Sequence, residues 1–532
     1  MESDKFMKRQ HFVTHAGGSA QTVRFLFRDL CPADAAAAYA FFAALSEKSA
    51  SYFDPGNVNL RRTRDYLTGG DPSSRFFAAF QEGSGVLAGI AFLRHTDGAC
   101  PAFGMAVADR FQGLGLGTAF LKFVIETAKE DGFSGIVLRT ARTNLAAQRC
   151  YEKNGFFCTG TDTDGEFIYR LDLTGGSAEP IYHAKNFLPA AKNHSEAIER
   201  CLMQAKRIPG KKTVVFDGLD FLVNRAILIP QDTQIRVVDC EIRQKDGVFD
   251  NLFRGDNVTV DPAAPNGAPL SVAPICGVSI IGEGDARLCG AGKAATGYHP
   301  VLKETQPMVG DFWGWRTILI SLSRCSGFEI AGLKISDTKG WALSFDSCEN
   351  GFVHDLDIRS DVKNGDGVNF RSGCQNCRVE DIRGSTSDDT VACTALHGAL
   401  KAFPHKNYLF PLEPYNSILP PEIPLDIHDI SIKNVRTGGK HHGVICLAAE
   451  GSRVYRIAIE NIVEAEPSER QAVVKIYTGY GGGYKKGDIS DVSVKNVTAN
   501  GAKYAVLIEA ETENLLLENI THPVPENAVV HL

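Results

Sequence analysis

The stretch FVHDLDIRSD, residues 352–361, alternates apolar with polar side chains and ends on turn-forming residues. Six other segments follow the same pattern: FEIAGLKISD from residue 328, CRVEDIRGST from 377, ISIKNVRTGG from 430, IAIENIVEA from 457, VSVKNVTANG from 492 and LLLENITHP from 515. Subtracting successive starts gives spacings of 24, 25, 53, 27, 35 and 23 residues. Strict alternation indicates half-buried strands. A period of about two dozen residues, with insertions at some turns, predicts a solenoid of short strands.

This repeat favours a parallel β-helix over residues 181–532, whose coils bury Ile, Val and Leu against the coils on either side. The alternatives are a β-sandwich and a propeller, but a propeller blade needs about four strands in roughly 40 residues, more than one unit here contains. The segment SEAIERCLMQAKRI, residues 195–208, reads as a helix, and we expect it to cover the exposed sheet edge of the first coil. Residues 175–180, GGSAEP, are the expected linker.

Composition and length fit a globular protein of more than one domain. The chain has 532 residues, 44% apolar and 22% charged, and a formal net charge of -7, which gives no general reason to expect nucleic acid or an anionic membrane as partner. No apolar run suits a signal peptide or a spanning helix, so we expect a cytoplasmic location. The 14 cysteines are expected to be reduced, with Cys374 and Cys377 packed in the core. No metal site is expected.

Residues 22–174 have a different pattern, in which strand-like segments, among them 101–108 and 135–141, alternate with helix-like segments, among them 33–49. This predicts a separate α/β domain. VADRFQGLGLGTAF, residues 107–120, places three glycines between a strand and a helix. Backbone N–H groups at such a helix start make an anion site that suits a pyrophosphate. Glycines also serve simple turns, but a second block, NLAAQRCYEKNGF at residues 144–156, follows on another predicted helix.

Together the two blocks resemble the GNAT superfamily of acetyl-CoA-dependent N-acetyltransferases, whose motifs read Q/R-x-x-G-x-G/A and N-x-x-A-x-x-x-Y-E-K-x-G-F. The matching residues are Gln112, Gly115, Gly117, Asn144, Ala147, Tyr151, Gly155 and Phe156. The resemblance implies that acetyl-CoA is the acyl donor and that its pyrophosphate binds along Val107, Gln112, Gly113, Leu114, Gly115, Leu116, Gly117 and Thr118. It also implies that Asn144 contacts the cofactor arm and that Tyr151 protonates the departing thiolate.

The general base and the acceptor amine stay open. Glu47, Asp54 and Glu82 are candidates for the base only because they lie where acceptor loops are expected. A domain that binds acyl-CoA without transferring the acyl group is the alternative, and Tyr151 argues against it because a phenol beside the sulfur suits general acid catalysis.

Three aspartates of the repeat region are expected to converge. Asp366 lies in N-G-D-G, and Asp388 and Asp389 follow 22 and 23 residues later, by subtraction. Residues one period apart in a solenoid stack about 5 Å apart. Clustered carboxylates repel one another, but they keep one acid protonated while another stays a base, which is what a glycosidase requires. Turn formation is the alternative for each aspartate.

N-x-D-G, then D-D, then H-G resembles the polygalacturonases, glycoside hydrolase family 28, within the right-handed parallel β-helices of the pectin-lyase-like superfamily. The matching residues are Asn364, Asp366, Gly367, Asp388, Asp389, His442 and Gly443. The resemblance implies an inverting hydrolysis in which Asp388 or Asp389 is the acid and the other two aspartates activate water. His442 would tune the cluster or contact the substrate, and Asn364 would contact the substrate.

The pattern departs from that family at the residues that bind a sugar carboxylate. The family's R-I-K aligns with Lys475, Ile476 and Tyr477, so that only Lys475 keeps a charge, and a uronic acid substrate is in question. Lys475 and Tyr477 are nevertheless expected to bind substrate. An insertion at residues 396–425, rich in Pro and aromatics, is expected either to wall the cleft or to be a packed excursion. For Trp313 and Trp315, core packing is favoured over sugar stacking.

These observations predict a bifunctional carbohydrate-modifying enzyme, an N-acetyltransferase fused to a glycoside hydrolase. Its partner would be a small oligosaccharide or amino-sugar conjugate, with no nucleic acid and no membrane. Two alternatives remain for the repeat region: a β-helix that binds a saccharide without cleaving it, and a polysaccharide lyase or epimerase on the same scaffold.

Overall fold

The computed structural model describes residues 10–15, 22–174, 179–396, 409–410, 422–465, 468–480 and 482–532. The chain divides into two compact units, Met1–Tyr182 and His183–Leu532. No helix in these described ranges is long and apolar enough to cross a bilayer. Most of the insertion at 396–425 and of the linker at 175–180 lies outside the described residues.

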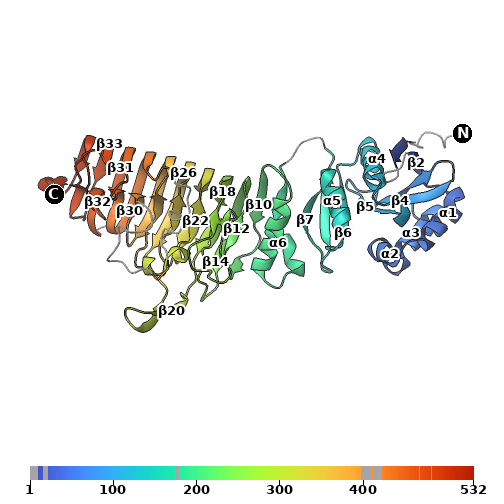
Figure 1. Cartoon of the computed structure of the whole chain (residues 1–532), viewed down its shortest axis with the longest axis horizontal. Coiled ribbons are helices and arrows are strands. Elements are labelled where there is room, and N and C mark those ends of the chain that lie inside the picture. Colours follow the sequence, from blue (N-terminus) through green and yellow to red (C-terminus); the bar gives the residue numbers. More distant parts are fainter. Residues whose placement is uncertain are drawn as a thin grey trace. The chain divides into compact units, whose positions relative to one another are not determined.

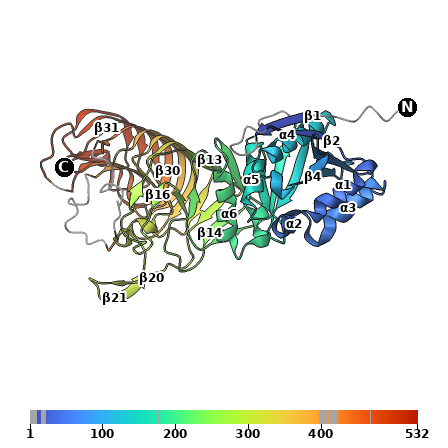
Figure 2. The same ribbon diagram turned by 45° about the vertical axis from the view of Figure 1, so that its right-hand side comes forward.

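The first unit is one sheet with helices. Its strands run in the order β1-β2-β3-β4-β5-β6-β8-β7. The strands are β1 (Gln10–His15), β2 (Thr22–Asp29), β3 (Ser74–Gln81), β4 (Val86–Arg94), β5 (Ala102–Val107), β6 (Gly135–Thr140), β7 (Phe157–Thr161) and β8 (Phe167–Asp172). The helices are α1 (Ala35–Ala43), α2 (Glu47–Phe53), α3 (Val58–Leu67), α4 (Leu116–Glu130) and α5 (Leu145–Lys153). Helices α1 to α3 lie apart from α4 and α5, with strands between them (Figure 2).

Buried phenylalanines join these layers. Phe27 of β2 lies 5.1 Å from Phe120 and 5.6 Å from Phe123, ring centre to ring centre, and both partners are on α4. All three rings are at most 1% exposed. The apolar stripe of α4 therefore fixes this helix, and the glycine-rich turn before it, against the sheet.

The sequence suggested one helix from residue 33 to residue 49, and this was wrong. Helix α1 ends at Ala43 and α2 begins at Glu47. Ser46 between them has extended backbone and its Oγ accepts a hydrogen bond from the Ser49 amide, at 3.3 Å. A serine in this conformation is a favoured helix cap, so it starts a new helix instead of continuing the old one.

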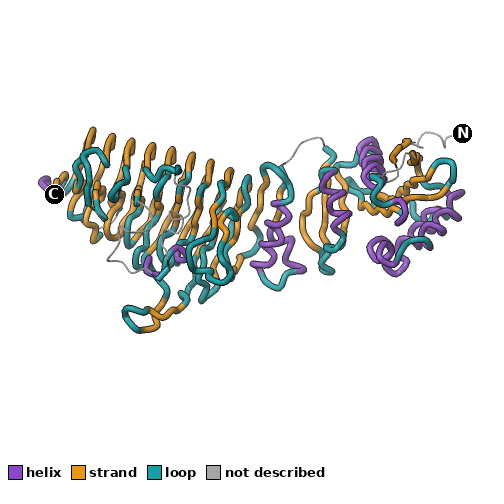
Figure 3. The backbone as a smooth tube through the Cα atoms, in the orientation of Figure 1, coloured by secondary structure: helices purple, strands orange, loops and turns teal. Residues whose placement is uncertain are grey.

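The second unit consists of short strands in successive coils, from α6 and β10 to β36 (Figures 1 and 3). The first set of strands comprises β9 (Ile181–His183), β10 (Lys212–Phe216), β11 (Phe221–Val223), β12 (Ile227–Ile229), β13 (Thr233–Val238), β14 (Glu241–Gln244), β15 (Phe253–Gly255), β16 (Val258–Thr259), β17 (Ser271–Val272), β18 (Ile275–Glu283), β19 (Arg287–Cys289), β20 (Thr296–His299), β21 (Glu304–Pro307), β22 (Ile320–Ser323), β23 (Cys325–Ala331) and β24 (Lys334–Ser336). The second set comprises β25 (Leu343–Asp346), β26 (Glu349–Ser360), β27 (Val368–Arg371), β28 (Gln375–Thr386), β29 (Val391–Ala395), β30 (Ile427–Ala448), β31 (Val454–Glu464), β32 (Glu469–Thr478), β33 (Ile489–Thr498), β34 (Tyr504–Glu509), β35 (Glu513–Thr521) and β36 (Val529–His531).

Most of these strands pair in parallel with the strand one repeat further along. One series of parallel pairs is β10-β13-β18-β23-β26-β28-β30-β31-β33-β35. The other, called the cavity series below, is β12-β15-β22-β25-β27-β29-β30-β32-β34-β36. The unit is therefore a large, mostly parallel β-strand region.

The register follows the sequence repeat closely. Cys377 pairs with Ile430, Ile430 with Ile457, Ile457 with Val492 and Val492 with Leu515. One predicted segment start is off by one residue. The segment is predicted from the sequence to begin at Phe352, but the residue that pairs with Phe328 is Gly351. A β-carbon on Gly351 would lie 2.0 Å from the Phe328 ring, so the ring fills the inward position and glycine is required there.

Helix α6 (His194–Lys206) covers the first strands of the second unit. Its Ile198 and Cys201 are buried, and His194 Nδ1 accepts a hydrogen bond from the Leu222 amide of β11, at 2.9 Å. Trp313 and Trp315 are at most 1% exposed, which confirms packing over sugar stacking. Cys374 and Cys377 are buried free thiols.

Candidate functional sites

Strands β5 and β6 of the first unit pair only briefly. They are parallel, and their register partners are Ala102 with Val137 and Phe103 with Leu138. β5 continues to Val107 and β6 to Thr140 without further pairing between them. Two strands that diverge in this way leave backbone N–H and C=O groups for an extended ligand to pair with. The opening leads toward the glycine-rich turn, which follows β5 directly.

The glycine-rich turn presents its amides at the start of α4. Gly113 and Gly115 have φ of 79° and 77°, in the left-handed region, and Gly115 is the N-cap residue. The first hydrogen bond of the helix runs from the Ala119 amide to the Gly115 carbonyl, at 3.1 Å. The amides of residues 116–118 therefore have no acceptor within the helix. A β-carbon on Gly113 would meet no atom within 4 Å, so this side of the turn has room for a pyrophosphate.

Side chains around Gln112 fix the turn. Gln112 Nε2 donates to the Val107 carbonyl, at 3.0 Å, and to Ser49 Oγ, at 3.2 Å. Asp109 accepts from Ser46 and Ser49 of the α2 region. These donors, the Ser46 hydroxyl above all, lower the pKa of Asp109 to about 2. Sequence reasoning named Gln112 but missed Asp109, which is one residue of a short 3-10 turn and matches no motif.

Tyr151 and Asn144 lie on α5, beside the point where β5 and β6 separate. The Tyr151 ring centre is 6.3 Å from that of Phe103, the last paired residue of β5. Burial raises the pKa of Tyr151 above its usual value, so the phenol stays protonated and has a hydrogen to donate. Asn144 is the N-cap of α5, and its Oδ1 accepts from the Ala147 amide, at 3.2 Å. The Asn144 oxygen thus already has a structural partner.

The three candidates for the general base occupy different surroundings. Asp54 is 7% exposed and accepts hydrogen bonds from the amides of Asn59 and Leu60 at the start of α3. Glu82 accepts from His11 of β1, and Glu47 is an exposed residue in the first turn of α2. None of these contacts selects one of them as the base.

In the second unit, the predicted aspartates and His442 occupy matching positions of the cavity series. The Ala342 amide donates to the Asp366 carbonyl at 2.8 Å, the Gly367 amide to the Asp389 carbonyl at 2.9 Å, and the Thr390 amide to the His442 carbonyl at 3.0 Å. Each bond joins one coil to the next. Asp366, Asp389 and His442 therefore stack on three successive coils, as the sequence repeat predicts for the first two.

The structure brings every residue predicted for this second site to one cavity of about 350 Å³. Its lining comprises Asp311, Trp341, Asn364, Asp366, Arg371, Asp388, Asp389, Thr394, Leu396, His441, His442, Ile445, Leu447, Gln471, Lys475, Tyr477 and Tyr480. Asp311, Trp341, Arg371, Gln471 and Tyr480 were missed. No motif marks them, and only their place on neighbouring coils brings them here.

Two of the three aspartates hold their protons unusually tightly. Burial, and next the charge of Asp389, raise the pKa of Asp388 to about 7. Burial, followed by the charges of Asp388 and Asp389, raises the pKa of Asp366 well above its ordinary value. A carboxyl group that is protonated near neutral pH, beside a second that is hydrogen-bonded to a histidine, gives the acid and the base that glycoside cleavage needs.

A chain of polar side chains runs from Asp389 to Glu509. His442 Nδ1 lies 2.7 Å from Asp389 Oδ1, and His442 Nε2 lies 2.9 Å from Gln471 Oε1. Lys475 Nζ donates to the same Gln471 oxygen, at 3.0 Å, and pairs with Glu509, at 2.9 Å. Because the Gln471 oxygen only accepts, Nε2 of His442 carries a hydrogen. Asp389 and Nδ1 therefore share one further proton.

Gln471 reaches this position through a β-bulge. His441 pairs with Arg470 and His442 pairs with Ala472, so Gln471 is the extra residue in β32. Next to it, buried Arg470 donates to the Thr390 hydroxyl at 2.9 Å and to the Gly438 carbonyl at 2.5 Å. Burial lowers the pKa of Arg470 to about 10 although Asp389 opposes this shift. This guanidinium lies behind the aspartates and keeps its charge at neutral pH.

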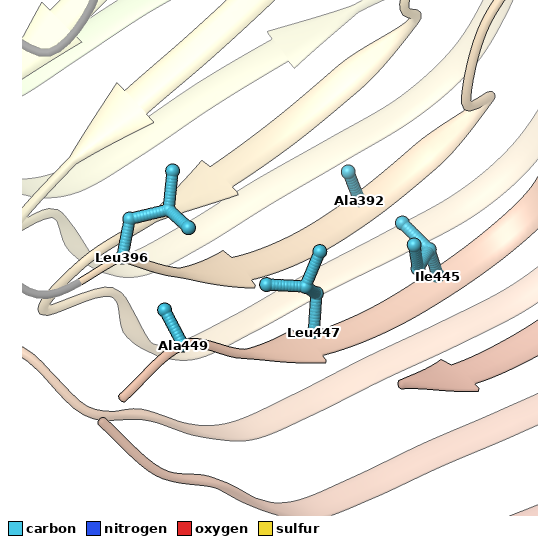
Figure 4. Packing of buried hydrophobic residues seen from close by; sticks show 5 residues of the cluster. All are labelled: Ala392, Leu396, Ile445, Leu447 and Ala449. Atoms are coloured by element: carbon cyan, nitrogen blue, oxygen red, sulfur yellow. The ribbon is translucent and has the colours of Figure 1, made fainter. Parts of the chain in front are cut away.

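One wall of the cavity is apolar. Leu396, Ile445 and Leu447 line it, and they pack with Ala392 and Ala449 in one buried cluster. Their side chains project from the same side of β29 and β30 (Figure 4), and Tyr477 and Tyr480 pack against them. The Lys475 Nζ atom also lies over the Tyr477 ring, 4.6 Å from the ring centre.

Comparison with known proteins bears on the first unit. Residues 41–156 match the profile of the Acetyltransferase (GNAT) family. Streptothricin acetyltransferase A of Bacillus subtilis (strain 168) is 41% identical over 59 residues, which are 11% of this chain and 34% of that protein. The match thus spans about a third of the length of that relative. The family match ends at residue 156 and does not extend into the second unit.

Solved structures similar to this chain are also acetyltransferases. The GNAT domain of a protein from S. lividans is 18% identical and aligns with 31% of this chain and 96% of that one, with a TM-score of 0.27. A putative acetyltransferase from Salmonella typhimurium, solved with acetyl-CoA, is 22% identical and aligns with 29% of this chain and 96% of that one, with a TM-score of 0.23. The assignment therefore rests on the family profile: residues 41–156 form an acetyltransferase domain of the GNAT family.

Proposed function

We propose that the first unit is an acetyl-CoA-dependent N-acetyltransferase that acts on a small amine. The observation that carries this proposal is the family match across residues 41–156, together with the diverging β5 and β6 that open beside the free amides of α4. The amides of residues 113–118 would hold the pyrophosphate of acetyl-CoA, which supplies an activated acetyl thioester. The name of the streptothricin acetyltransferase relative supports an amine-bearing acceptor.

The chemistry assigned to this chain is proton transfer and orientation. Attack by the amine on the thioester carbonyl would form an amide and break the C–S bond, the phenol of Tyr151 would give its proton to the departing sulfur, and the proton lost by the amine would restore the phenol. Burial raises the pKa of Tyr151, so the phenol is protonated before the sulfur departs. Phe103 and Tyr169 pack around the ring and fix its direction.

The test is a panel of amines incubated with the full chain and acetyl-CoA. Release of free thiol and a gain of one acetyl group by mass spectrometry would establish the activity and name the acceptor. If acetyl-CoA binds but no amine gains an acetyl group, the alternative of a binding domain without transfer is correct.

We further propose that the second unit is a right-handed parallel β-helix that hydrolyses a glycosidic bond. The carrying observation is the stacking of Asp366, Asp389 and His442 on successive coils around one cavity. The long parallel series and their constant register support the β-helix, and the raised pKa values of Asp388 and Asp366 support acid catalysis.

In this reaction Asp388 would donate its proton to the glycosidic oxygen as the bond from that oxygen to the anomeric carbon breaks. Water would attack that carbon from the opposite face and lose a proton to Asp389, with inversion. The proton would arrive at the second carboxylate oxygen of Asp389, because Oδ1 already shares a proton with His442 Nδ1, at 2.7 Å. Linking both units in one chain would raise the local concentration of a shared amino-sugar intermediate.

Product analysis separates this reaction from the two alternatives. A hydrolase produces new reducing ends, a lyase produces an unsaturated sugar that absorbs in the ultraviolet, and a binding module produces neither. An oligosaccharide panel analysed by mass spectrometry, with and without acetyl-CoA, shows in addition whether one molecule is modified by both units.

A further inference from the structure

Carboxyl groups outnumber cations in the cavity of the second unit. Asp311, Asp366, Asp388 and Asp389 line it, against the cations Arg371 and Lys475. Lys475 is already paired with Glu509, which lies outside the lining. Burial raises the pKa of Asp366 and of Asp388, but a cation bound beside them favours their ionised form, and an anion does not.

Two buried acceptor atoms in this lining lack donors. Asp366 is 6% exposed, and its Oδ1 has no hydrogen-bond partner among the described residues. Asn364 Oδ1 is likewise buried without a partner in the described ranges. Buried acceptors without donors are costly. Both atoms belong to residues that line the cavity; a ligand that brings N–H donors would satisfy them once these side chains turn toward it, and a carboxylate would not.

The apolar wall of the cavity completes the description of the ligand. Leu396, Ile445 and Leu447 line the cavity together with Tyr477 and Tyr480. Aromatic and aliphatic side chains suit the C–H face of a sugar ring. The lining therefore combines an apolar wall for a ring with acceptors for a charged donor.

We propose that this cavity binds an amine-bearing saccharide as its free ammonium form, with the ammonium donating to Asp366 and Asn364. Acetylation converts the ammonium to a neutral and larger amide, so the acetylated sugar is no longer a ligand. This part rests on the proposed function of the first unit. Cleavage by the second unit then precedes acetylation, and acetylation of an intact oligosaccharide protects it from cleavage.

The experiment measures binding by titration calorimetry to the full chain without acetyl-CoA. The probes are four tetrasaccharides, each built from one sugar: glucosamine, N-acetylglucosamine, glucose or galacturonate. We expect the glucosamine tetramer to bind at least tenfold more tightly than the other three. All four probes are titrated into the same wild-type protein, so a difference between them cannot come from misfolding of a variant.

Asp366→Asn should remove most of the preference for the ammonium form, since an amide keeps the shape but cannot ionise beside a bound ammonium. Asp285→Asn is the matched control, because Asp285 is an exposed carboxylate paired with Arg287 and Lys334; it should bind as the wild type does. Any binding of the amine to the first unit would remain in Asp366→Asn.

Equal or tighter binding of the acetylated or galacturonate tetramer overturns the inference, and so does a lack of binding by all four probes. Selective binding of glucosamine without new reducing ends would support the inference and overturn only the hydrolase proposal. Failure of the first unit to acetylate glucosamine would overturn only the proposed order of reactions.

Discussion

The two candidate sites are built from different parts of the chain. The candidate site of the first unit consists mainly of backbone groups: the amides at the start of α4 and the unpaired edges of β5 and β6. In the second unit, side chains from successive coils converge on a cavity, and the backbone is occupied in pairing those coils. A site made of backbone depends on glycine and strand geometry, whereas a site made of side chains depends on the register of the repeat.

The largest expected effect separates the two sites by chemistry. Asp388→Asn should lower saccharide cleavage by about 10²- to 10⁴-fold, because it removes the proposed general acid, and should leave acetyl transfer unchanged. Reducing-end and thiol-release assays on the same preparation measure both. Cleavage falling with rising pH above about 7, the pKa of Asp388, is expected for the wild type. Retention of wild-type cleavage by the variant would contradict the assignment.

The next effect concerns stability. Asp388 has a folded pKa raised from 3.8 to about 7, so its stabilising contribution is complete below pH 3.8 and is lost as pH rises to 7. Asp388→Asn should therefore unfold like the wild type at low pH and be more stable at pH 8, by at most about 4 kcal/mol. Urea unfolding at several pH values measures this.

Asp285→Asn provides a control of opposite sign. Hydrogen bonds from Arg287 and then Lys334 lower the pKa of Asp285 to about 2, so the carboxylate favours the folded state above its unfolded pKa of 3.8 and loses this contribution as pH falls toward 2. Its amide variant should gain no stability at pH 8. A similar gain in both variants would show that the effect is unrelated to burial in the cavity.

In the first unit, Tyr151→Phe should lower kcat by about 100-fold with little change in KM for acetyl-CoA, since only the proton of the phenol is lost. Tyr169→Phe is a matched control, because Tyr169 is equally buried, its ring centre is 6.1 Å from that of Tyr151, and its hydroxyl donates to Glu152. An unchanged kcat in Tyr151→Phe would assign the proton to another donor.

The smallest effect tests the backbone site directly. In Gly117→Ala the new β-carbon would meet only Val107 at 3.7 Å and Met105 at 3.8 Å, which are ordinary contacts. The variant should fold normally and bind acetyl-CoA as the wild type does, because the motif Q/R-x-x-G-x-G/A has glycine or alanine at this position. Gly115→Ala, at φ 77°, should lose about 1–2 kcal/mol of stability and bind acetyl-CoA about tenfold more weakly, because it would distort the amides proposed to hold the pyrophosphate. Calorimetric binding and thermal unfolding measure these two effects.

Repeat spacing and motifs predicted the sites better than their surroundings. The length of one repeat placed Asp366 one coil from Asp389, because strands in constant register preserve such a count. Counting residues by the repeat length fails at β32, where the bulge adds Gln471. Neither Gln471 nor the neighbouring Arg470 was therefore predicted. Bulges depend on tertiary contacts that alternation does not record.

The first unit shows the same limit. Its glycine turn and Tyr151 were read from their motifs, but α3 was missed because its segment VNLRRTRDYL is mostly polar. The sequence pattern indicated both β5 and β6 as strands, but it carries no information on how many backbone hydrogen bonds join them. The divergence after Phe103 and Leu138, on which the cofactor site depends, was therefore outside the reach of sequence reasoning.

The unequal coil lengths of the second unit have a practical consequence. Val368 pairs with Val391, and Val391 pairs in turn with Val444, although the second step along the chain is more than twice as long as the first. The parallel pairing of the strands nevertheless continues in the same register. The corner between Ala395 and Ile427 thus tolerates chains of very different length. Foreign loops could be grafted at that corner to build a library of altered ligand preference while the acids beneath stay in place.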